Sequence, residues 1–193
     1  MHTICVVHGV GFFRGLVKET RIKYFCDQLT ARTGADCIVY SWDHTGKIPT
    51  DPERDSWFFK PIRSFVQEVI TDYSYVLKNL TKLVAEMPVA DMYVGHSAGS
   101  VIVGSSTLRP QVLMGSPLQL VLNLGLKATI PDIINIMHYR DPIAAPMNGV
   151  DNIVLDHPRI FPLIDPIIGH MSYWNNDEVI EIAADFYKEH FRI

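Results

Sequence analysis

The sequence of 193 residues lacks several features that would assign a function class at once. No apolar run reaches the roughly 18 residues that suggest a membrane-spanning helix. The first residues, Met-His-Thr, lack the basic start of a secretory signal, and we interpret residues 3–7 as a strand instead. The formal net charge of −4 also argues against nucleic-acid binding. Proteins that bind nucleic acids usually carry a basic surface. We therefore expect a cytoplasmic protein that neither spans a membrane nor binds nucleic acid.

Cysteine is scarce, since only Cys5, Cys26 and Cys37 are present. They form no Cys-x-x-Cys pair and no spacing typical of metal ligands. Their odd number leaves at least one thiol without a partner. We interpret all three as reduced thiols in the interior of a cytosolic protein.

The common cofactor motifs are missing as well. Gly9 and Gly11 begin a pattern like the dinucleotide fingerprint, but Arg14 stands where the third glycine would be required. The sequence contains no Gly-Lys-Ser/Thr phosphate loop and no His-Glu-x-x-His zinc helix. We expect neither a cofactor nor a metal.

What the sequence does contain is an alternation of two hydrophobic patterns. Short β-branched runs predict strands, and an apolar residue every three or four positions predicts helices. The predicted strands span residues 3–7, 36–42, 89–94, 133–139 and 152–155, and the predicted helices span residues 18–32, 61–87, 100–108 and 177–191. Such alternation is typical of parallel strands joined by helical crossovers. With 48% hydrophobic residues, we expect one α/β domain over residues 1–193, with helices on both faces of its sheet.

Four details of this pattern can be checked against a structure. We expect residues 36–42 to form a buried strand, and the apolar stripe of the helix over residues 61–87 to pack against the sheet. We expect Asn176 to be the N-cap of the last helix. Residues 43–55 are polar and rich in turn-forming residues. We interpret residues 44–60 as an insertion or a small lid.

The strongest motif is Gly-His-Ser-Ala-Gly at residues 95–99. It follows an apolar run and precedes a helix-like one, which is the strand–turn–helix setting of a nucleophile elbow. A sharp turn there lifts Ser97 clear of the sheet, and Gly95 and Gly99 leave room for the crowded backbone. We predict that Ser97 is a catalytic nucleophile. His96 leaves the turn in another direction, so we expect it to pack or to form hydrogen bonds.

A serine nucleophile requires a base, and the base requires a group that orients it. Asp141 follows the predicted strand 133–139 and therefore lies at the carboxyl end of that strand. His170 follows Gly169 in the loop before the last helix, and this loop can reach toward Ser97. We predict His170 as the general base and Asp141 as the acid that orients it.

Other residues compete for both roles. Among the competing histidines, His44 lies in the turn-rich insertion and His157 directly before a proline. His138 lies inside a predicted strand, and His190 lies inside the last helix. The competing acids are Asp43, Asp156 and Asp165. Asp43 precedes the nucleophile in the chain, and Asp165 is close enough in sequence to His170 to shape the loop of that histidine.

These motifs and their order, serine, then aspartate, then histidine, resemble the α/β-hydrolase superfamily, in particular its small lipases and esterases. The resemblance covers nearly the whole chain. It implies that residues 8–11, His-Gly-Val-Gly, form an oxyanion loop braced by His8, with the N–H groups of Val10 and Ala98 as the oxyanion donors. Residues 113–117 resemble the strand end after the nucleophile helix. The superfamily usually has two strands before the oxyanion strand, so the resemblance implies a shortened, mostly parallel sheet of about six strands.

The function that the resemblance implies is hydrolysis of carboxylic esters by a carboxylesterase-like or lipase-like serine hydrolase. The partner would be a small ester-like substrate, and no cofactor would be needed. A thioesterase, an amidase or a peptidase would use the same triad, and an inactive binding module would have the same fold; these alternatives stay open. The sequence contains no signal for an oligomeric state.

Two stretches of the sequence are candidates for the substrate pocket. Residues 158–168 are apolar and rich in proline beside His170, and we predict that they form a wall of the acyl pocket. The residues predicted to touch substrate are Phe12, Trp57, Phe161, Ile164 and Ile167. A chain of this length has little room for a cap, which favours short or medium acyl chains.

Overall fold

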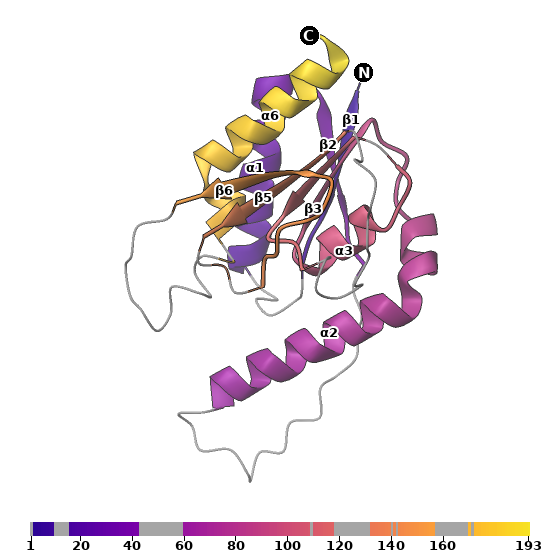
Figure 1. Ribbon diagram of the computed structural model, residues 1–193, viewed down its shortest axis with the longest axis vertical. Coiled ribbons are helices and arrows are strands. Elements are labelled where there is room, and N and C mark those ends of the chain that lie inside the picture. Colours follow the sequence, from indigo (N-terminus) through magenta and orange to yellow (C-terminus); the bar gives the residue numbers. More distant parts are fainter. Residues whose placement is uncertain are drawn as a thin grey trace.

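The computed structural model describes residues 2–9, 16–42, 60–108, 110–117, 132–139, 141, 143–156, 170 and 172–193. Strands and helices alternate along these residues, as the hydrophobic patterns predict (Figure 1). In chain order the elements are β1 (Thr3–Val7), α1 (Leu16–Thr33), β2 (Asp36–Tyr40), α2 (Lys60–Ala85), β3 (Met92–His96), α3 (Ala98–Gly104), β4 (Gln111–Met114), β5 (Ile133–His138), β6 (Asp151–Leu155), the 3-10 helix η1 (Ser172–Asn175) and α6 (Asp177–Phe191).

The six strands form one sheet in the order β2-β1-β3-β4-β5-β6, and every neighbouring pair is parallel. The expected shortened parallel α/β sheet is therefore confirmed. The chain runs outward from β1 to β2 on one side and from β3 to β6 on the other, so the strand order reverses between β1 and β3. In open α/β sheets, ligands bind beyond the carboxyl ends of the strands at such a reversal.

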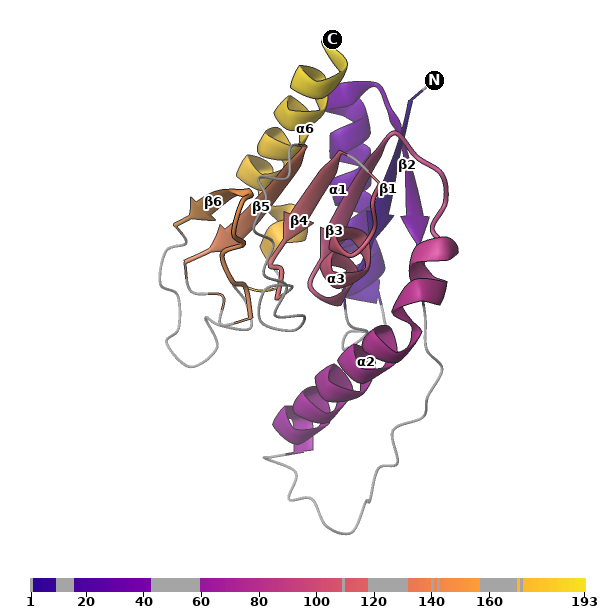
Figure 2. The same ribbon diagram turned by 45° about the vertical axis from the view of Figure 1, so that its right-hand side comes forward.

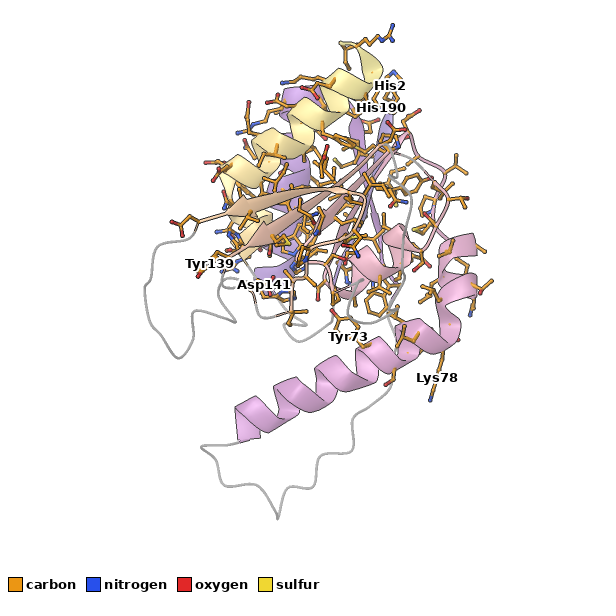
Figure 3. The ribbon with its side chains drawn as sticks, in the orientation of Figure 1. His2, Tyr73, Lys78, Tyr139, Asp141 and His190 are labelled. Carbon is orange, nitrogen blue, oxygen red and sulfur yellow. The ribbon has the colours of Figure 1, made fainter. Side chains whose placement is uncertain are left out.

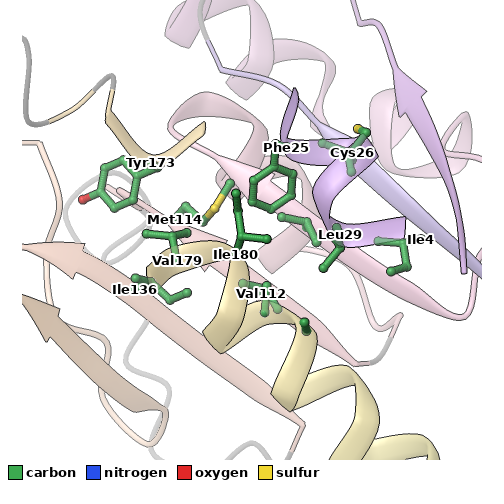
Figure 4. Packing of buried hydrophobic residues seen from close by; sticks show 14 of the residues in the cluster. Ile4, Phe25, Cys26, Leu29, Val112, Met114, Ile136, Tyr173, Val179 and Ile180 are labelled. Carbon is green, nitrogen blue, oxygen red and sulfur yellow. The ribbon is translucent and has the colours of Figure 1, made fainter. Parts of the chain in front are cut away.

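Helices cover both faces of the sheet, with α1 and α6 on one face and α3 on the other (Figures 1 and 2). Because successive side chains of a strand point to opposite faces, the strands feed two separate hydrophobic clusters. In β4, for example, Val112 and Met114 join the cluster that includes α1 and α6, whereas Leu113 joins the cluster that includes α2 and α3. Figure 4 shows the first cluster, in which Phe25 of α1 and Ile180 of α6 meet above the sheet.

Strand β2 is not the buried strand that residues 36–42 predict. It ends at Tyr40, and Ile38 and Val39 are 38% and 42% exposed. The reason is its position, since β2 pairs only with β1 and forms an edge of the sheet. An apolar run indicates a strand but does not tell an edge strand from a central one.

Strand β3 begins later than the expected residues 89–94. Val89 is 93% exposed, and the strand starts at Met92 and runs to His96, inside the glycine-serine motif. Tyr93 stabilises the preceding turn, because its hydroxyl accepts a hydrogen bond from the Ala90 N–H and donates one to the Pro88 carbonyl.

The apolar stripe of α2 packs against the protein in the second half of the helix, where side chains are described from Tyr73 onward. Val76 and Leu83 are buried in the cluster that includes α3, as expected, whereas Leu77 is 41% exposed. Leu77 is exposed because it is turned by about 100° from Val76 around the helix axis. In both ribbon views the second half of α2 lies beside α3, and its first half extends past the carboxyl ends of the strands (Figures 1 and 2).

The helix ends follow ordinary capping chemistry. Helix α6 spans the predicted residues, and Asn176 is its N-cap, because the Asn176 side-chain oxygen accepts a hydrogen bond from the Glu178 N–H at 2.9 Å. Helix α1 stops at Gly34, which has a φ of +71°. Among the helices of the described residues, none has the length and apolarity required to cross a membrane.

Candidate active site

Ser97 occupies the turn between β3 and α3 in a strained conformation. Its φ is +54° and its ψ is −122°, a combination that residues with a side chain rarely adopt. The Ser97 N–H still donates to the Met114 carbonyl at 3.0 Å, so the turn remains tied to β4. This strained turn from strand to helix is the geometry of a nucleophile elbow.

Three glycines make this turn sterically feasible. A Cβ on Gly95 would lie 2.7 Å from the Ser100 Cα, and one on Gly99 would lie even closer to the Val7 carbonyl oxygen. A Cβ on Gly9 would lie 2.7 Å from the Ser97 Cβ. Because these three residues have no side chain, the end of β1, the start of α3 and Ser97 can lie close together.

The structure brings Ser97, His170 and Asp141 into one hydrogen-bonded chain. The Nε2 of His170 is 2.8 Å from the Ser97 Oγ, and its Nδ1 is 2.8 Å from the Asp141 Oδ2. All three residues are buried. Ser97 and Asp141 follow the carboxyl ends of β3 and β5, and Figure 3 shows Asp141 at this edge of the sheet. His170 follows β6 in the chain and is helical, not in a loop as expected.

Asp141 is held as a carboxylate by four hydrogen bonds. Its Oδ1 accepts from the N–H groups of Ile143 and Ala144 at 2.9 and 3.2 Å, and its Oδ2 accepts from the Tyr173 hydroxyl at 2.9 Å and from His170. Burial alone would raise the pKa of Asp141, but the hydrogen bond and charge of His170 and these other donors hold that pKa below its usual value. An ionised Asp141 can only accept, so the His170 Nδ1 carries the proton and the His170 Nε2 accepts from the Ser97 hydroxyl.

Tyr173 connects the acid to the sheet. Its place in residues 171–174 predicts only that this segment clamps His170, and the sequence does not reveal the contact of Tyr173 with Asp141. The Tyr173 hydroxyl accepts from the His138 N–H at 2.8 Å while it donates to Asp141. Burial, followed by the charge of Asp141, raises the pKa of Tyr173, so the phenol stays protonated. The only available signal is its place in the segment after His170.

His96 has the packing and hydrogen-bonding environment expected for it. Its Nε2–H donates to the His170 carbonyl at 2.8 Å, and its ring lies against the rings of Tyr173 and Trp174. His96 therefore fixes the backbone of His170 and does not contact the Ser97 hydroxyl in any described hydrogen bond.

Tyr73 is a second residue that sequence reasoning missed. Its hydroxyl lies 3.0 Å from the Ser97 Oγ and comes from α2, on the face of the sheet opposite α1 and α6. In the sequence it is one apolar position of a helical stripe, and nothing in the pattern distinguishes it from a core residue.

The competing bases and acids lie away from Ser97 wherever they are described. The Nε2 of His138 is hydrogen-bonded to the Ser172 hydroxyl, and His190 lies 3.4 Å from the Asp132 carboxylate. Asp156 is exposed after the end of β6. The other competitors, His44, His157, Asp43 and Asp165, lie outside the described residues.

The predicted oxyanion site is described in part. Ala98 is fully buried and is the first residue of α3, where helical N–H groups lack partners within the helix. Val10 lies outside the described residues. His8, two residues before it in the chain, is buried, donates from Nδ1 to the Gly9 carbonyl and stacks on Trp42. The predicted substrate residues Phe12, Trp57, Phe161, Ile164 and Ile167 all lie outside the described residues.

The cysteines and other candidate ligands form no metal site in the part of the chain that is described, where no group of three or more suitable side chains is found. All three cysteines are free thiols; Cys5 and Cys26 are buried and Cys37 is half-buried. Burial raises the pKa of Cys5 to about 12, which makes it a poor nucleophile.

Comparison with known proteins finds solved structures whose sequence identity to this chain is low. Neither a protein-family model nor a curated protein sequence matches the chain. Similar structures include carboxyl esterase 2 of the fungus Tuber melanosporum, at 13% identity over 97% of this chain and 78% of that chain, with a TM-score of 0.47. A candidate hydrolase of the alpha/beta superfamily from Xanthomonas campestris has 14% identity over 100% and 99% of the two chains and a TM-score of 0.43. The esterase domain of a Rhodothermus marinus protein has 11% identity over 88% and 83%, with a TM-score of 0.41.

The fold is α/β-hydrolase-like, and this assignment depends on the chain's own geometry. A parallel sheet carries a strained serine directly after β3, an aspartate after β5 and a histidine after β6. This arrangement follows the order of elements and of functional residues in that superfamily.

Proposed function

We propose that the protein is a serine hydrolase that cleaves carboxylic esters through an acyl-enzyme on Ser97. The observation that carries the proposal is the continuous chain of hydrogen bonds from the Ser97 Oγ through His170 to the buried Asp141 carboxylate. An imidazole that accepts from a serine hydroxyl and donates to a carboxylate is poised to take up the serine proton.

The first half of the reaction forms the acyl-enzyme. The Ser97 proton moves to the His170 Nε2 as the Ser97 Oγ attacks the ester carbonyl carbon. The positive charge on the imidazolium is stabilised by Asp141, which remains ionised. When the tetrahedral intermediate collapses, the bond to the leaving oxygen breaks, and His170 returns its proton to that oxygen, which leaves as an alcohol.

The second half releases the acid by the same proton path. A water molecule gives a proton to the His170 Nε2 and attacks the acyl carbon. The bond between that carbon and the Ser97 Oγ then breaks, and the Ser97 oxygen recovers the proton from His170. The protein is returned to its starting state, and no cofactor takes part.

The negative oxygen of both intermediates needs hydrogen-bond donors. The position of Ala98 at the start of α3 supports its N–H as one such donor, and the Val10 N–H is proposed as the second. Donors of this kind are usually the largest single contribution to catalysis, because they are aligned before charge develops.

A fluorophosphonate probe tests the proposal, because it labels only an activated serine. The wild type should be labelled, and Ser97→Ala should abolish labelling and lower ester turnover by roughly 10⁶-fold. Ser106→Ala is a matched control, since Ser106 is also buried but lies two residues beyond the end of α3 and contacts Gln111. Retained turnover above a few per cent in Ser97→Ala would refute the nucleophile. A substrate panel of esters, thioesters and amides then identifies the preferred leaving group.

A further inference from the structure

Helix α2 delivers one side chain to the reacting serine. The Tyr73 hydroxyl lies 3.0 Å from the Ser97 Oγ. Figure 3 shows Tyr73 on the side of α2 that faces the sheet, whereas Lys78 of the same helix points away from it. Tyr73 therefore contacts an atom that changes its bonding during the proposed reaction, and it does so from an element that carries no other proposed catalytic residue.

The direction of this hydrogen bond follows from the other partners of the serine. A hydroxyl has one proton to donate, and the Ser97 proton is directed to the His170 Nε2, which is the acceptor 2.8 Å away. Tyr73 must therefore donate to the Ser97 Oγ. Burial raises the pKa of Tyr73, which keeps the phenol neutral and able to donate at neutral pH.

We propose that Tyr73 is a further catalytic residue, whose hydroxyl donates to the negative oxygen of the tetrahedral intermediates formed on Ser97. The inference depends on the proposed function of Ser97. When the Ser97 Oγ bonds to the substrate carbon, it becomes an ester-type oxygen and a weaker acceptor. The oxyanion is bonded to the same carbon and carries the charge, so rotation of the phenol O–H toward it forms the stronger, charge-assisted hydrogen bond.

This donor is independent of the two backbone donors. Val10 follows β1 in the chain and Ala98 is the first residue of α3, whereas Tyr73 belongs to α2. A neutral phenol in a buried site needs little reorganisation as the charge develops, which is the condition under which such donors are most effective. Tyr73 would bind the transition state more strongly than the ester in its ground state.

The test is the variant Tyr73→Phe, which removes the hydroxyl and keeps the ring. We expect kcat/KM to fall by roughly 10²- to 10³-fold, mainly through kcat, as for the loss of other oxyanion donors. An alkyl boronic acid adds to the serine as a tetrahedral anion, so its inhibition constant should weaken in step with kcat/KM. The inhibition constant of the alcohol product, which carries no negative oxygen, should stay unchanged.

Tyr40→Phe is the matched control. The Tyr40 hydroxyl donates to the Leu83 carbonyl of α2 at 3.2 Å, so this variant also removes a phenol hydroxyl that contacts α2, but away from Ser97. Tyr40→Phe should lower stability slightly and leave kcat/KM and boronate inhibition unchanged. Equal losses in Tyr40→Phe and Tyr73→Phe would show that the hydroxyl only anchors α2, and this result would overturn the proposal.

A second substitution covers the case in which Tyr73→Phe does not fold. Replacing Tyr73 with 3,5-difluorotyrosine keeps the shape and lowers the phenol pKa. A phenolate cannot donate and repels the oxyanion, so the alkaline loss of activity should move to lower pH than in the wild type. An unmoved alkaline limb would overturn the proposal.

The labelling experiment separates the two hypotheses. If fluorophosphonate labels the wild type and not Ser97→Ala, the proposed function stands whatever Tyr73→Phe does. Wild-type turnover and boronate affinity in Tyr73→Phe would then refute only the role of Tyr73. Faster labelling of Tyr73→Phe would also refute it, because the phenol would then be blocking the serine.

Discussion

Replacing Gly115 by alanine should damage the proposed proton path far more than it damages the fold. Gly115 follows β4 with a φ of +55°. A Cβ there would lie 2.9 Å from the Asp141 Oδ2, 2.9 Å from the Tyr173 Cε2 and 3.2 Å from the His170 Nδ1. The methyl group would press against the hydrogen bond between the acid and the base from one side, so these side chains must move.

The magnitudes of the two effects can be separated. The left-handed backbone costs an alanine about 1–2 kcal/mol, which in a protein of this size lowers the melting temperature by about 2–4 °C per kcal/mol. Displacement of reacting groups by about 1 Å can cost on the order of 10²-fold in rate. We therefore expect Gly115→Ala to lose up to about 100-fold in kcat.

Gly34→Ala is the control for backbone strain alone. Gly34 has a φ of +71°, and a Cβ there would have no neighbour within 4 Å. Thermal unfolding and steady-state ester hydrolysis should be measured on both variants. The left-handed backbone should lower the free energy of unfolding of Gly34→Ala by a similar amount, about 1–2 kcal/mol. Its kcat should stay unchanged. If the two variants keep equal activity, contact between Gly115 and the proposed triad has no catalytic consequence, and the reasoning fails.

Three further predictions concern the acid, the pH dependence of stability and the substrate. Asp141→Asn should lower kcat by about 10⁴-fold, because an amide favours the wrong histidine tautomer; a similar loss in Asp165→Asn instead would reassign the acid. Since the pKa of Asp141 is lowered in the folded state, its contribution to stability is present above its ordinary value of 3.8 and is lost as the pH falls through the lower folded value. The stability advantage of the wild type over Asp141→Asn in urea unfolding should therefore shrink as the pH falls below 3.8. An advantage that does not shrink would contradict this. Activity on aryl esters should peak at about two to eight acyl carbons with no jump at the emulsion point; such a jump would indicate that residues 44–60 act as a lid.

The positions of Ser97, Asp141 and His170 could be predicted because parallel strands have a common carboxyl edge. Each residue follows a predicted strand or the loop after one, and this placement puts all three at that edge. Their order in the chain then gives the resemblance to the superfamily. Their catalytic roles stay predictions. The sequence could not exclude His157 or Asp165 by geometry, since their distance from Ser97 depends on loop conformation.

Tyr73 and Gly115 could not be predicted for two different physical reasons. Tyr73 is an aromatic residue on an apolar helical stripe, and its contact with Ser97 depends on how α2 packs against the sheet, which the sequence pattern does not encode. Gly115 is one of 12 glycines, and its importance depends on contacts with side chains that are distant in sequence. The exposure of β2 was missed because a strand's hydrophobic pattern does not encode its place in the sheet.

The division of the core into two clusters has a consequence for how this protein can diversify. The acid and base are backed by Tyr173 and the cluster of α1 and α6, whereas Tyr73 belongs to the cluster of α2 and α3 on the other face. A change in α2 can thus reshape what approaches Ser97 without repacking the side that holds Asp141 and His170. Substitutions that change the substrate preference, in nature or in a directed-evolution experiment, can therefore accumulate on the face that carries α2 and α3. The packing on the face that carries α1 and α6 can meanwhile stay unchanged.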